Sequence, residues 1–184
     1  LQNTPLGIDM RFYDQNKGIR LDKNSLSERH AHATLSPKIC ILIHGTTENE
    51  ATWQFRDKSD YGSLLQHDFQ YTPFYLRYNT GSHISDNGKA LAAILEELYQ
   101  NYPVQIEEIS IIAHSMGGLV THSACHYAQE NGWAWATKIK NIFLLAAPHL
   151  GSFLERFANL TTNILEKVPN WHTRLVGKVL NLRS

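Results

Sequence analysis

Residues 109–120 read Ile-Ser-Ile-Ile-Ala-His-Ser-Met-Gly-Gly-Leu-Val, and this stretch decides the fold. A β-branched apolar run ends at Ser115, small residues follow, and a helical pattern begins at once. Strand, sharp turn and helix in this order form a nucleophile elbow, which raises a serine hydroxyl above the carboxyl edge of a parallel sheet. Ala113 replaces the first glycine of G-x-S-x-G and Gly117 keeps the second, and the strained turn tolerates one extra methyl group. We interpret Ser115 as a nucleophile; the alternative is a serine that only caps the helix.

A serine nucleophile also needs donors that stabilise the oxyanion. Residues 38–47, Lys-Ile-Cys-Ile-Leu-Ile-His-Gly-Thr-Thr, predict a buried strand that ends in a polar loop. The expected donors are the N–H of Met116, directly after the serine, and the N–H of Thr46 in this loop. Gly45 is expected to permit a backbone bend that a side chain would block. For His44 we favour a structural role, bracing the loop through a hydrogen bond, over a catalytic one.

Three segments resemble α/β-hydrolases of the lipase and esterase type: 41–45, 113–118 and 143–152. The last, Phe-Leu-Leu-Ala-Ala-Pro-His-Leu-Gly-Ser, resembles a segment of bacterial lipases and of GPI inositol-deacylase-like hydrolases. Residues 77–81, Arg-Tyr-Asn-Thr-Gly, are similar to bacterial members of the same group. The resemblance implies a mostly parallel sheet with helices on both faces. It also implies an acyl-transfer site whose shape depends on His114 and His149, without fixing the acyl group or the acceptor.

The remaining members of a catalytic triad are harder to place. In this superfamily an acid and then a histidine follow the serine, yet no aspartate follows Ser115. The later glutamates and histidines are Glu130, Glu155, Glu166, His122, His126, His149 and His172. We predict that the chain is the N-terminal part of a longer hydrolase and lacks the C-terminal strands, whose loops supply the acid and the base. Two alternatives stay open: a base within this chain, with His149 as the first candidate, and a catalytically silent binding module.

Composition limits the partners of the chain. It has 184 residues, 42% of them hydrophobic, which suffices for one domain over 1–184. The formal net charge is zero and no basic run occurs, so we predict no nucleic-acid partner. No apolar stretch approaches the roughly 20 residues of a transmembrane helix. Two cysteines form no disulfide framework and no signal peptide is visible, which favours a cytoplasmic location, although the chain begins with Leu1 and leaves a removed leader open.

The hydrophobic pattern alternates between strands and helices, as in a parallel sheet covered by helices. Ser85 or Asp86 is expected to cap one helix, and His30 and His32 are expected in a polar loop. The predicted elements are an edge hairpin over 6–22, strands 38–43, 73–78, 109–114 and 139–146, a short helix near 61–67, a helix from about 85, and the elbow helix 116–129.

Two further patterns have competing interpretations. His122 and His126 have the i, i+4 spacing of metal ligands, but Ser123 stands where a zinc protease carries glutamate, so we predict neither a metal nor an organic cofactor. Apolar residues recur at helical spacing over 151–184. They predict either helices that cover the core or a cap over an apolar acyl pocket.

Together these observations predict serine-dependent hydrolysis of carboxylic esters through an acyl-enzyme on Ser115, with an ester or a lipid as substrate. An acyltransferase or a thioesterase would use the same elbow.

Overall fold

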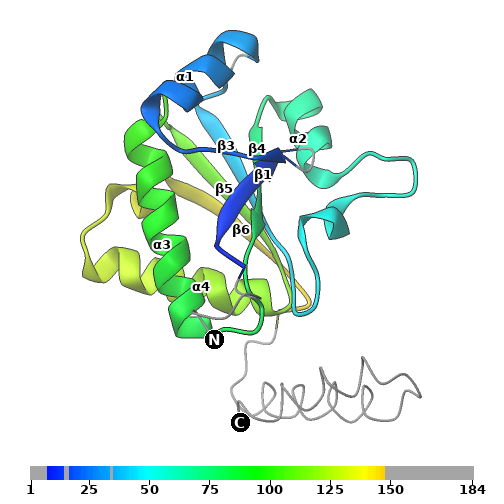
Figure 1. Ribbon diagram of the computed structural model, residues 1–184, viewed down its shortest axis with the longest axis vertical. Coiled ribbons are helices and arrows are strands. Elements are labelled where there is room, and N and C mark those ends of the chain that lie inside the picture. The colour runs from blue at the N-terminus through cyan, green and yellow to red at the C-terminus, as the bar shows by residue number, and fades with distance from the viewer. Residues whose placement is uncertain (1–7, 15–16, 34, 148–184) are drawn as a thin grey trace.

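A computed structural model describes residues 8–14, 17–33 and 35–147. Its six strands form one sheet in the order β2-β1-β4-β3-β5-β6 (Figure 1). Strands β3 to β6 pair in parallel, whereas β1 is antiparallel to both β4 and β2. The strands are β1 (Arg11–Asp14), β2 (Lys17–Gly18), β3 (Lys38–Ile43), β4 (Thr72–Arg77), β5 (Glu108–His114) and β6 (Ile139–Leu145). The predicted α/β class with a mostly parallel sheet is therefore confirmed.

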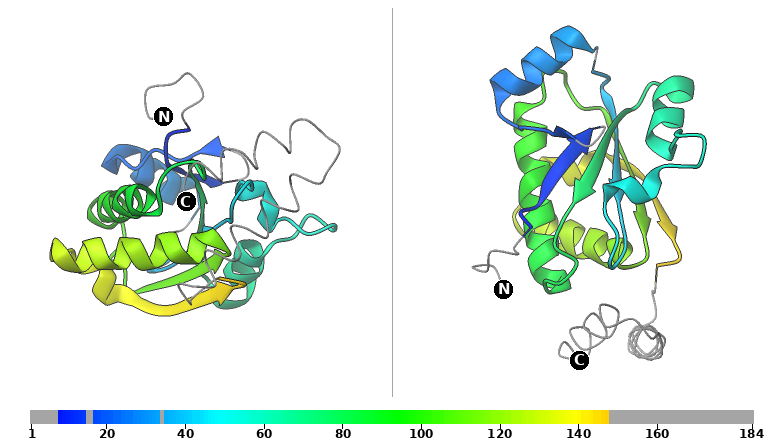
Figure 2. Two further views of the ribbon diagram at one scale, coloured as in Figure 1. Left: turned by 90° about the horizontal axis from the view of Figure 1, so that it is seen from below. Right: turned by 45° about the vertical axis from the view of Figure 1, so that its right-hand side comes forward.

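Helices cover both faces of this sheet. In the right-hand view of Figure 2, α1 and α3 lie on one side of the strands, and α2 and η1 lie on the other. The left-hand view shows α4 running beside α3. The helices are α1 (Lys23–His32), η1 (Glu50–Trp53), α2 (Tyr61–Phe69), α3 (Ile84–Asn101), α4 (Met116–Glu130) and η2 (Ala134–Lys138).

The alternation of side chains along the strands creates two apolar layers. On β3, Ile39, Ile41 and Ile43 join the larger core under α1, α3 and α4. Cys40 and Leu42 point to the opposite face, where they pack with Trp53 of η1 and other apolar residues. Because β3 is buried on both faces, its sequence reads as a continuous apolar run, as central parallel strands do.

Several predicted boundaries need correction. His30 and His32 lie in helix α1, because Asp22 accepts a hydrogen bond from the Ser25 N–H and starts a helix that its weak apolar pattern did not reveal. Helix α3 begins at Ile84, and neither Ser85 nor Asp86 caps it, since both lie in its first turn. The edge hairpin expected over 6–22 is shorter, with strands only at Arg11–Asp14 and Lys17–Gly18 in the described residues. The other predicted strands and helices are present, with ends shifted by two residues or fewer.

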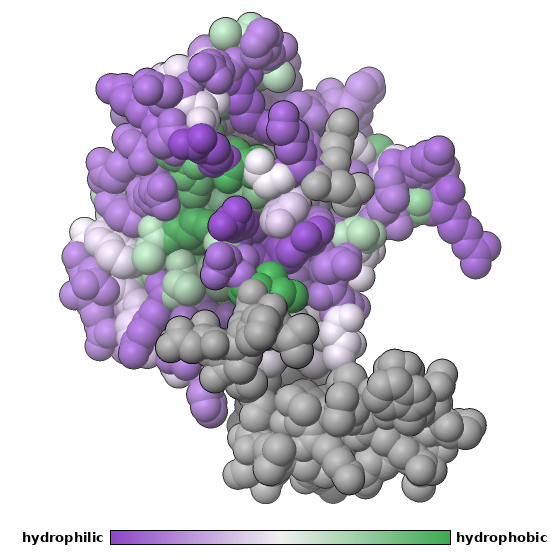
Figure 3. Space-filling model, viewed as in Figure 1, coloured by the Kyte–Doolittle hydropathy of each residue, from purple (hydrophilic) through white to green (hydrophobic). Residues whose placement is uncertain are grey.

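Strand β6 is the last strand of the described sheet, and its side chains differ from those of β3. Ile142, Phe143 and Leu145 are large apolar side chains that remain exposed, Phe143 at 53%. On the face shown in Figure 3 hydrophilic residues dominate, with apolar residues confined mainly to a region near its centre. Large apolar side chains are also exposed outside β6, among them Leu64 and Phe69 of α2. No helix in the described part of the chain has the length and apolar character that crossing a bilayer requires.

Candidate active site

Ser115 lies at the end of β5 with a backbone conformation that L-residues rarely adopt. Its φ is 51° and its ψ is −120°. Such a conformation costs on the order of 1–3 kcal/mol and persists only where the surroundings enforce it. Ser115 occupies the N-cap position of α4, yet its side chain accepts no capping hydrogen bond. The interpretation of Ser115 as a simple helix cap is therefore wrong.

The glycines after the serine allow the elbow to pack against neighbouring strands. A Cβ atom built on Gly117 would lie 2.6 Å from the Ile43 carbonyl oxygen and 2.7 Å from that of His44. A Cβ atom on Gly118 would lie 2.6 Å from the Ala147 Cβ. The Ser115 N–H donates to the Leu145 carbonyl at 2.8 Å, so the elbow is also fixed to the end of β6. Close packing on two sides thus holds Ser115 in its strained conformation.

The loop after β3 begins with a tight turn at residues 45–48, which we name the oxyanion turn after the role expected from the sequence. The Glu48 N–H donates to the Gly45 carbonyl at 3.4 Å, which closes the turn around Thr46 and Thr47. The Thr47 N–H donates to the Thr80 Oγ1 at 3.3 Å. Within the described residues, the Thr46 N–H donates to no protein acceptor, as expected for the second residue of a turn. It is therefore available to a ligand.

The oxyanion turn lies directly against the elbow. A Cβ atom built on Gly45 would be 3.0 Å from each of the Ser115 Cβ, the His114 Nδ1 and the Glu48 Oε2. Gly45 does not have a positive φ, so this close approach, and not a left-handed backbone conformation, favours glycine at the start of the turn. The Thr46 hydroxyl also contacts the Met116 Sδ at 3.4 Å. Both expected oxyanion donors thus belong to residues that touch each other.

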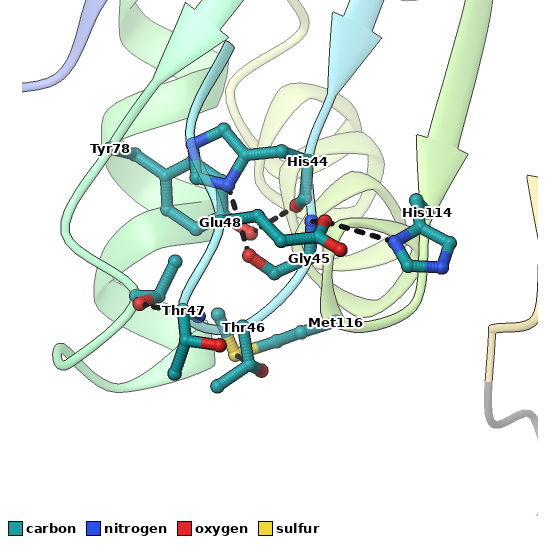
Figure 4. A network of polar contacts seen from close by, with 9 residues as sticks. His44, Gly45, Thr46, Thr47, Glu48, Tyr78, His114 and Met116 are labelled. Carbon is teal, nitrogen blue, oxygen red and sulfur yellow. Dashed lines mark hydrogen bonds and ion pairs between the residues drawn. The ribbon is translucent and has the colours of Figure 1, made fainter. Parts of the chain in front are cut away.

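His44 is completely buried beneath this turn. Its Nδ1 donates to the Gly45 carbonyl at 2.9 Å, and its ring stacks on Tyr78 with centroids 4.5 Å apart (Figure 4). Burial lowers the pKa of His44, which keeps the imidazole neutral near pH 7, although the hydrogen bond to Gly45 and the charge of Glu48 act in the opposite direction. These contacts support a structural role for His44.

The motif at residues 77–81 holds the loop after β3 in place. The Tyr78 hydroxyl donates to the His44 carbonyl at 2.7 Å. Arg77 Nε donates to the buried Glu50 carboxylate at 2.6 Å, and its guanidinium lies over the Tyr13 ring. Thr80 receives the Thr47 N–H described above. The sequence marked this motif without indicating its role, because its partners lie far away along the chain.

Glu48 is the residue at this site that sequence reasoning missed. Its Oε2 accepts a hydrogen bond from the Gly45 N–H at 2.7 Å and lies 3.0 Å from the His114 Nδ1. The triad order of this superfamily directs attention to acids that follow Ser115 in the chain. Glu48 precedes the serine, so no motif pointed to it.

No base for Ser115 is found among the described residues. His114 directs its Nδ1 to Glu48, and His122 and His126 lie on α4, where His126 pairs with Glu130 at 3.5 Å. No hydrogen bond joins a histidine to the Ser115 hydroxyl within the described ranges. His149 and the expected cap at 151–184 lie outside them. The described ranges contain no group of three or more His, Cys, Asp or Glu side chains that could hold a metal ion.

Two comparisons with protein sequences bear on the family of the chain. A protein-family model described as "Putative serine esterase (DUF676)" matches residues 35–183. A search of curated proteins found no match.

Two solved structures share the fold. One is the mature form of the Bacillus licheniformis lipase BlEst2, with a TM-score of 0.54 and 20% identity, over 79% of this chain and 53% of the lipase. The other is the propeptide form of the same lipase, with a TM-score of 0.50 and 17% identity, over 78% of this chain and 35% of that one. The chain therefore spans about half the length of the mature lipase that it matches.

Proposed function

The chain belongs to the family described as "Putative serine esterase (DUF676)", and from this membership we propose that it hydrolyses carboxylic esters with Ser115 as the nucleophile. One observation carries the proposal: Ser115 is held at φ 51° with a side chain that does not cap its helix. A fold that keeps such a strained, half-buried serine at the edge of its sheet supports a chemical role for the hydroxyl.

The chemistry follows from the two N–H groups beside the serine. Ser115 Oγ attacks the ester carbonyl, and its proton passes to a base. The Thr46 and Met116 N–H groups receive the charge that develops on the carbonyl oxygen. The alkoxide leaves with the proton, and water then hydrolyses the acyl-serine. Neither a metal ion nor an organic cofactor takes part in the proposed reaction.

The base and its acid are proposed to come from residues outside the described ranges. They lie either in 148–184, where His149 is the first candidate, or in further polypeptide of the full-length protein. The exposed apolar side chains of β6 and its place at the edge of the described sheet are compatible with additional strands there. An ester substrate follows from the family, whereas its acyl length and its alcohol are not indicated by any contact.

The proposal is tested with Ser115→Ala in the full-length protein. We expect this variant to lose p-nitrophenyl ester hydrolysis by up to about a million-fold, since loss of a triad nucleophile leaves only binding and oxyanion stabilisation. Ser27→Ala, at an exposed serine of α1, is the control and should keep full activity. A fluorophosphonate probe should label the wild type at Ser115.

Several outcomes would contradict the proposal, either in its reaction or in its nucleophile. A protein that neither labels nor hydrolyses esters would be a silent binding module. Faster turnover of thioesters, or transfer of the acyl group to an added alcohol in preference to water, would identify a thioesterase or an acyltransferase. Retention of a tenth of the activity by Ser115→Ala would place the nucleophile elsewhere.

A further inference from the structure

The Glu48 carboxylate connects the oxyanion turn to the elbow through a single oxygen atom. Figure 4 shows it between Gly45 and His114, the residue that precedes the nucleophile. The Gly45 N–H donates to Oε2 at 2.7 Å, and the His114 Nδ1 lies 3.0 Å from the same atom. Because an ionised carboxylate only accepts hydrogen bonds, the Nδ1 atom of His114 carries a proton in this contact.

Glu48 also closes the turn through its backbone. Its N–H donates to the Gly45 carbonyl, while its carboxylate accepts from the Gly45 N–H. Glu48 therefore bonds to both backbone polar groups of Gly45. Thr47, which lies between Gly45 and Glu48 in the turn, has a φ of 63°, which is uncommon for a β-branched residue. A turn with this strain reverts to other conformations unless its contacts fix it. Glu48 supplies two of these contacts, and Thr80 supplies another.

The contribution of this pair to global stability should be small. The side chains of Glu48 and His114 are 27% and 35% exposed, and ion pairs in contact with solvent add about 0–1 kcal/mol at most. A carboxylate next to a developing oxyanion is, moreover, electrostatically unfavourable by its sign alone. Neither stability nor charge explains an acid at this position, whereas its geometry does.

We propose that Glu48 is a positioning residue that sets the separation of the Thr46 and Met116 N–H groups by tying the oxyanion turn to His114. The role rests on the proposed esterase function. Glu48 acts on the backbone of the oxyanion turn, which carries the Thr46 N–H, and makes no contact with the substrate. An oxyanion donor is worth about 100- to 1,000-fold in rate, and a misplacement of about 1 Å costs about 100-fold, so loss of the tie should be visible in kcat.

The test compares Glu48→Ala with Glu48→Gln in the full-length protein. Glutamine keeps a carbonyl oxygen that accepts from both Gly45 and His114, but it removes the charge. We expect Glu48→Ala to lower kcat by about 10- to 100-fold with little change in KM, as for an interaction made only in the transition state. Glu48→Gln should restore kcat to within about threefold of the wild type. Fluorophosphonate labelling of Ser115 should slow in parallel in Glu48→Ala alone.

Asp22→Ala provides the matched control. Asp22 likewise accepts a backbone N–H, from Ser25 at 3.0 Å, and pairs with a cation, Arg20 at 3.1 Å, but it starts α1. Its loss should lower the melting temperature and leave kcat unchanged. An unchanged kcat in Glu48→Ala, or a loss in Glu48→Gln as large as in Glu48→Ala, would overturn the positioning role. A wild type that fails to label would refute the esterase proposal and with it the role of Glu48.

Discussion

The elbow and the oxyanion turn face each other, but they are held by different forces. The elbow is fixed by close packing: Gly117 lies against the carbonyl groups of Ile43 and His44, and Gly118 lies against Ala147. The oxyanion turn is fixed by two hydrogen bonds to side chains, from the Gly45 N–H to Glu48 and from the Thr47 N–H to Thr80. The elbow thus depends mainly on the absence of side chains, whereas the oxyanion turn needs the glycine at Gly45 and also the side-chain hydrogen bonds of Glu48 and Thr80.

The elbow and the oxyanion turn should therefore tolerate amino-acid substitutions differently. Packing against backbone carbonyls changes abruptly, because an added methyl group has nowhere to go. A network of hydrogen bonds loses its effect in steps, since each remaining bond still restricts the turn. Substitutions in the elbow should therefore have larger effects than single substitutions around the turn.

The largest effect is expected for Gly117→Ala. The new Cβ would lie 2.6 and 2.7 Å from two carbonyl oxygens of the β3 end, distances that only a backbone shift relieves. We expect a loss of about 1–3 kcal/mol in the free energy of unfolding. A fall in kcat on the order of 100-fold should accompany it, because the shift moves the Ser115 hydroxyl. Chemical denaturation and ester turnover measure the two effects.

Gly18→Ala is the control for this change. Gly18 lies in exposed β2, where an added Cβ would be no closer than 3.9 Å to its nearest neighbour, the Tyr13 ring. Its stability and turnover should stay near those of the wild type. Equal behaviour of the two alanine variants would show that packing does not hold the elbow.

A smaller effect is expected for Tyr78→Phe, which probes the hydrogen-bonded half. The change keeps the ring that stacks on His44 and removes only the hydroxyl that donates to the His44 carbonyl. A buried acceptor left without a partner costs about 1–3 kcal/mol. Because this carbonyl precedes the oxyanion turn, kcat should also fall, by roughly threefold to tenfold.

Tyr102→Phe is the control for Tyr78→Phe, because it removes a similar hydrogen bond at a place away from the site. The Tyr102 hydroxyl donates to the Ser36 carbonyl at 3.0 Å, near the beginning of β3 and away from the site. Its removal should cost a similar free energy of unfolding and leave kcat unchanged. If Tyr102→Phe lowered kcat as much as Tyr78→Phe, the effect on the oxyanion turn would be refuted.

The same contrast explains what the sequence predicted. Close packing requires small residues at fixed, short spacing, so Ser115, Gly117 and Gly118 stand out as a motif in the amino-acid sequence itself. The parallel sheet was predictable for a similar reason, since residues 39–43 of β3 form a continuous apolar run, the pattern of a central strand buried on both faces.

Hydrogen bonds between distant residues leave no such pattern. Glu48 and His114 are separated by 66 positions, and Arg77 and Glu50 by 27. Helix α1 was missed because its residues are mostly polar, with Leu26 as its one fully buried side chain in the described structure. Long-range polar contacts and weakly amphipathic helices therefore became visible only in three dimensions.

The smallest expected effect concerns the protonation of His44. Burial lowers its pKa in the folded protein, so the unfolded chain binds this proton more readily. Stability from the neutral ring is then complete above the ordinary histidine pKa of about 6.5 and is lost as the pH falls below it. Each unit by which the pKa is depressed corresponds to about 1.4 kcal/mol. Urea unfolding at pH 7.5 and pH 5.0 should therefore show a smaller decrease in stability for His44→Phe, which keeps a ring against Tyr78, than for the wild type. His67→Gln, at a histidine whose side chain is 86% exposed, should retain the wild-type dependence. An identical decrease in all three proteins would mean that folding does not lower the pKa of His44.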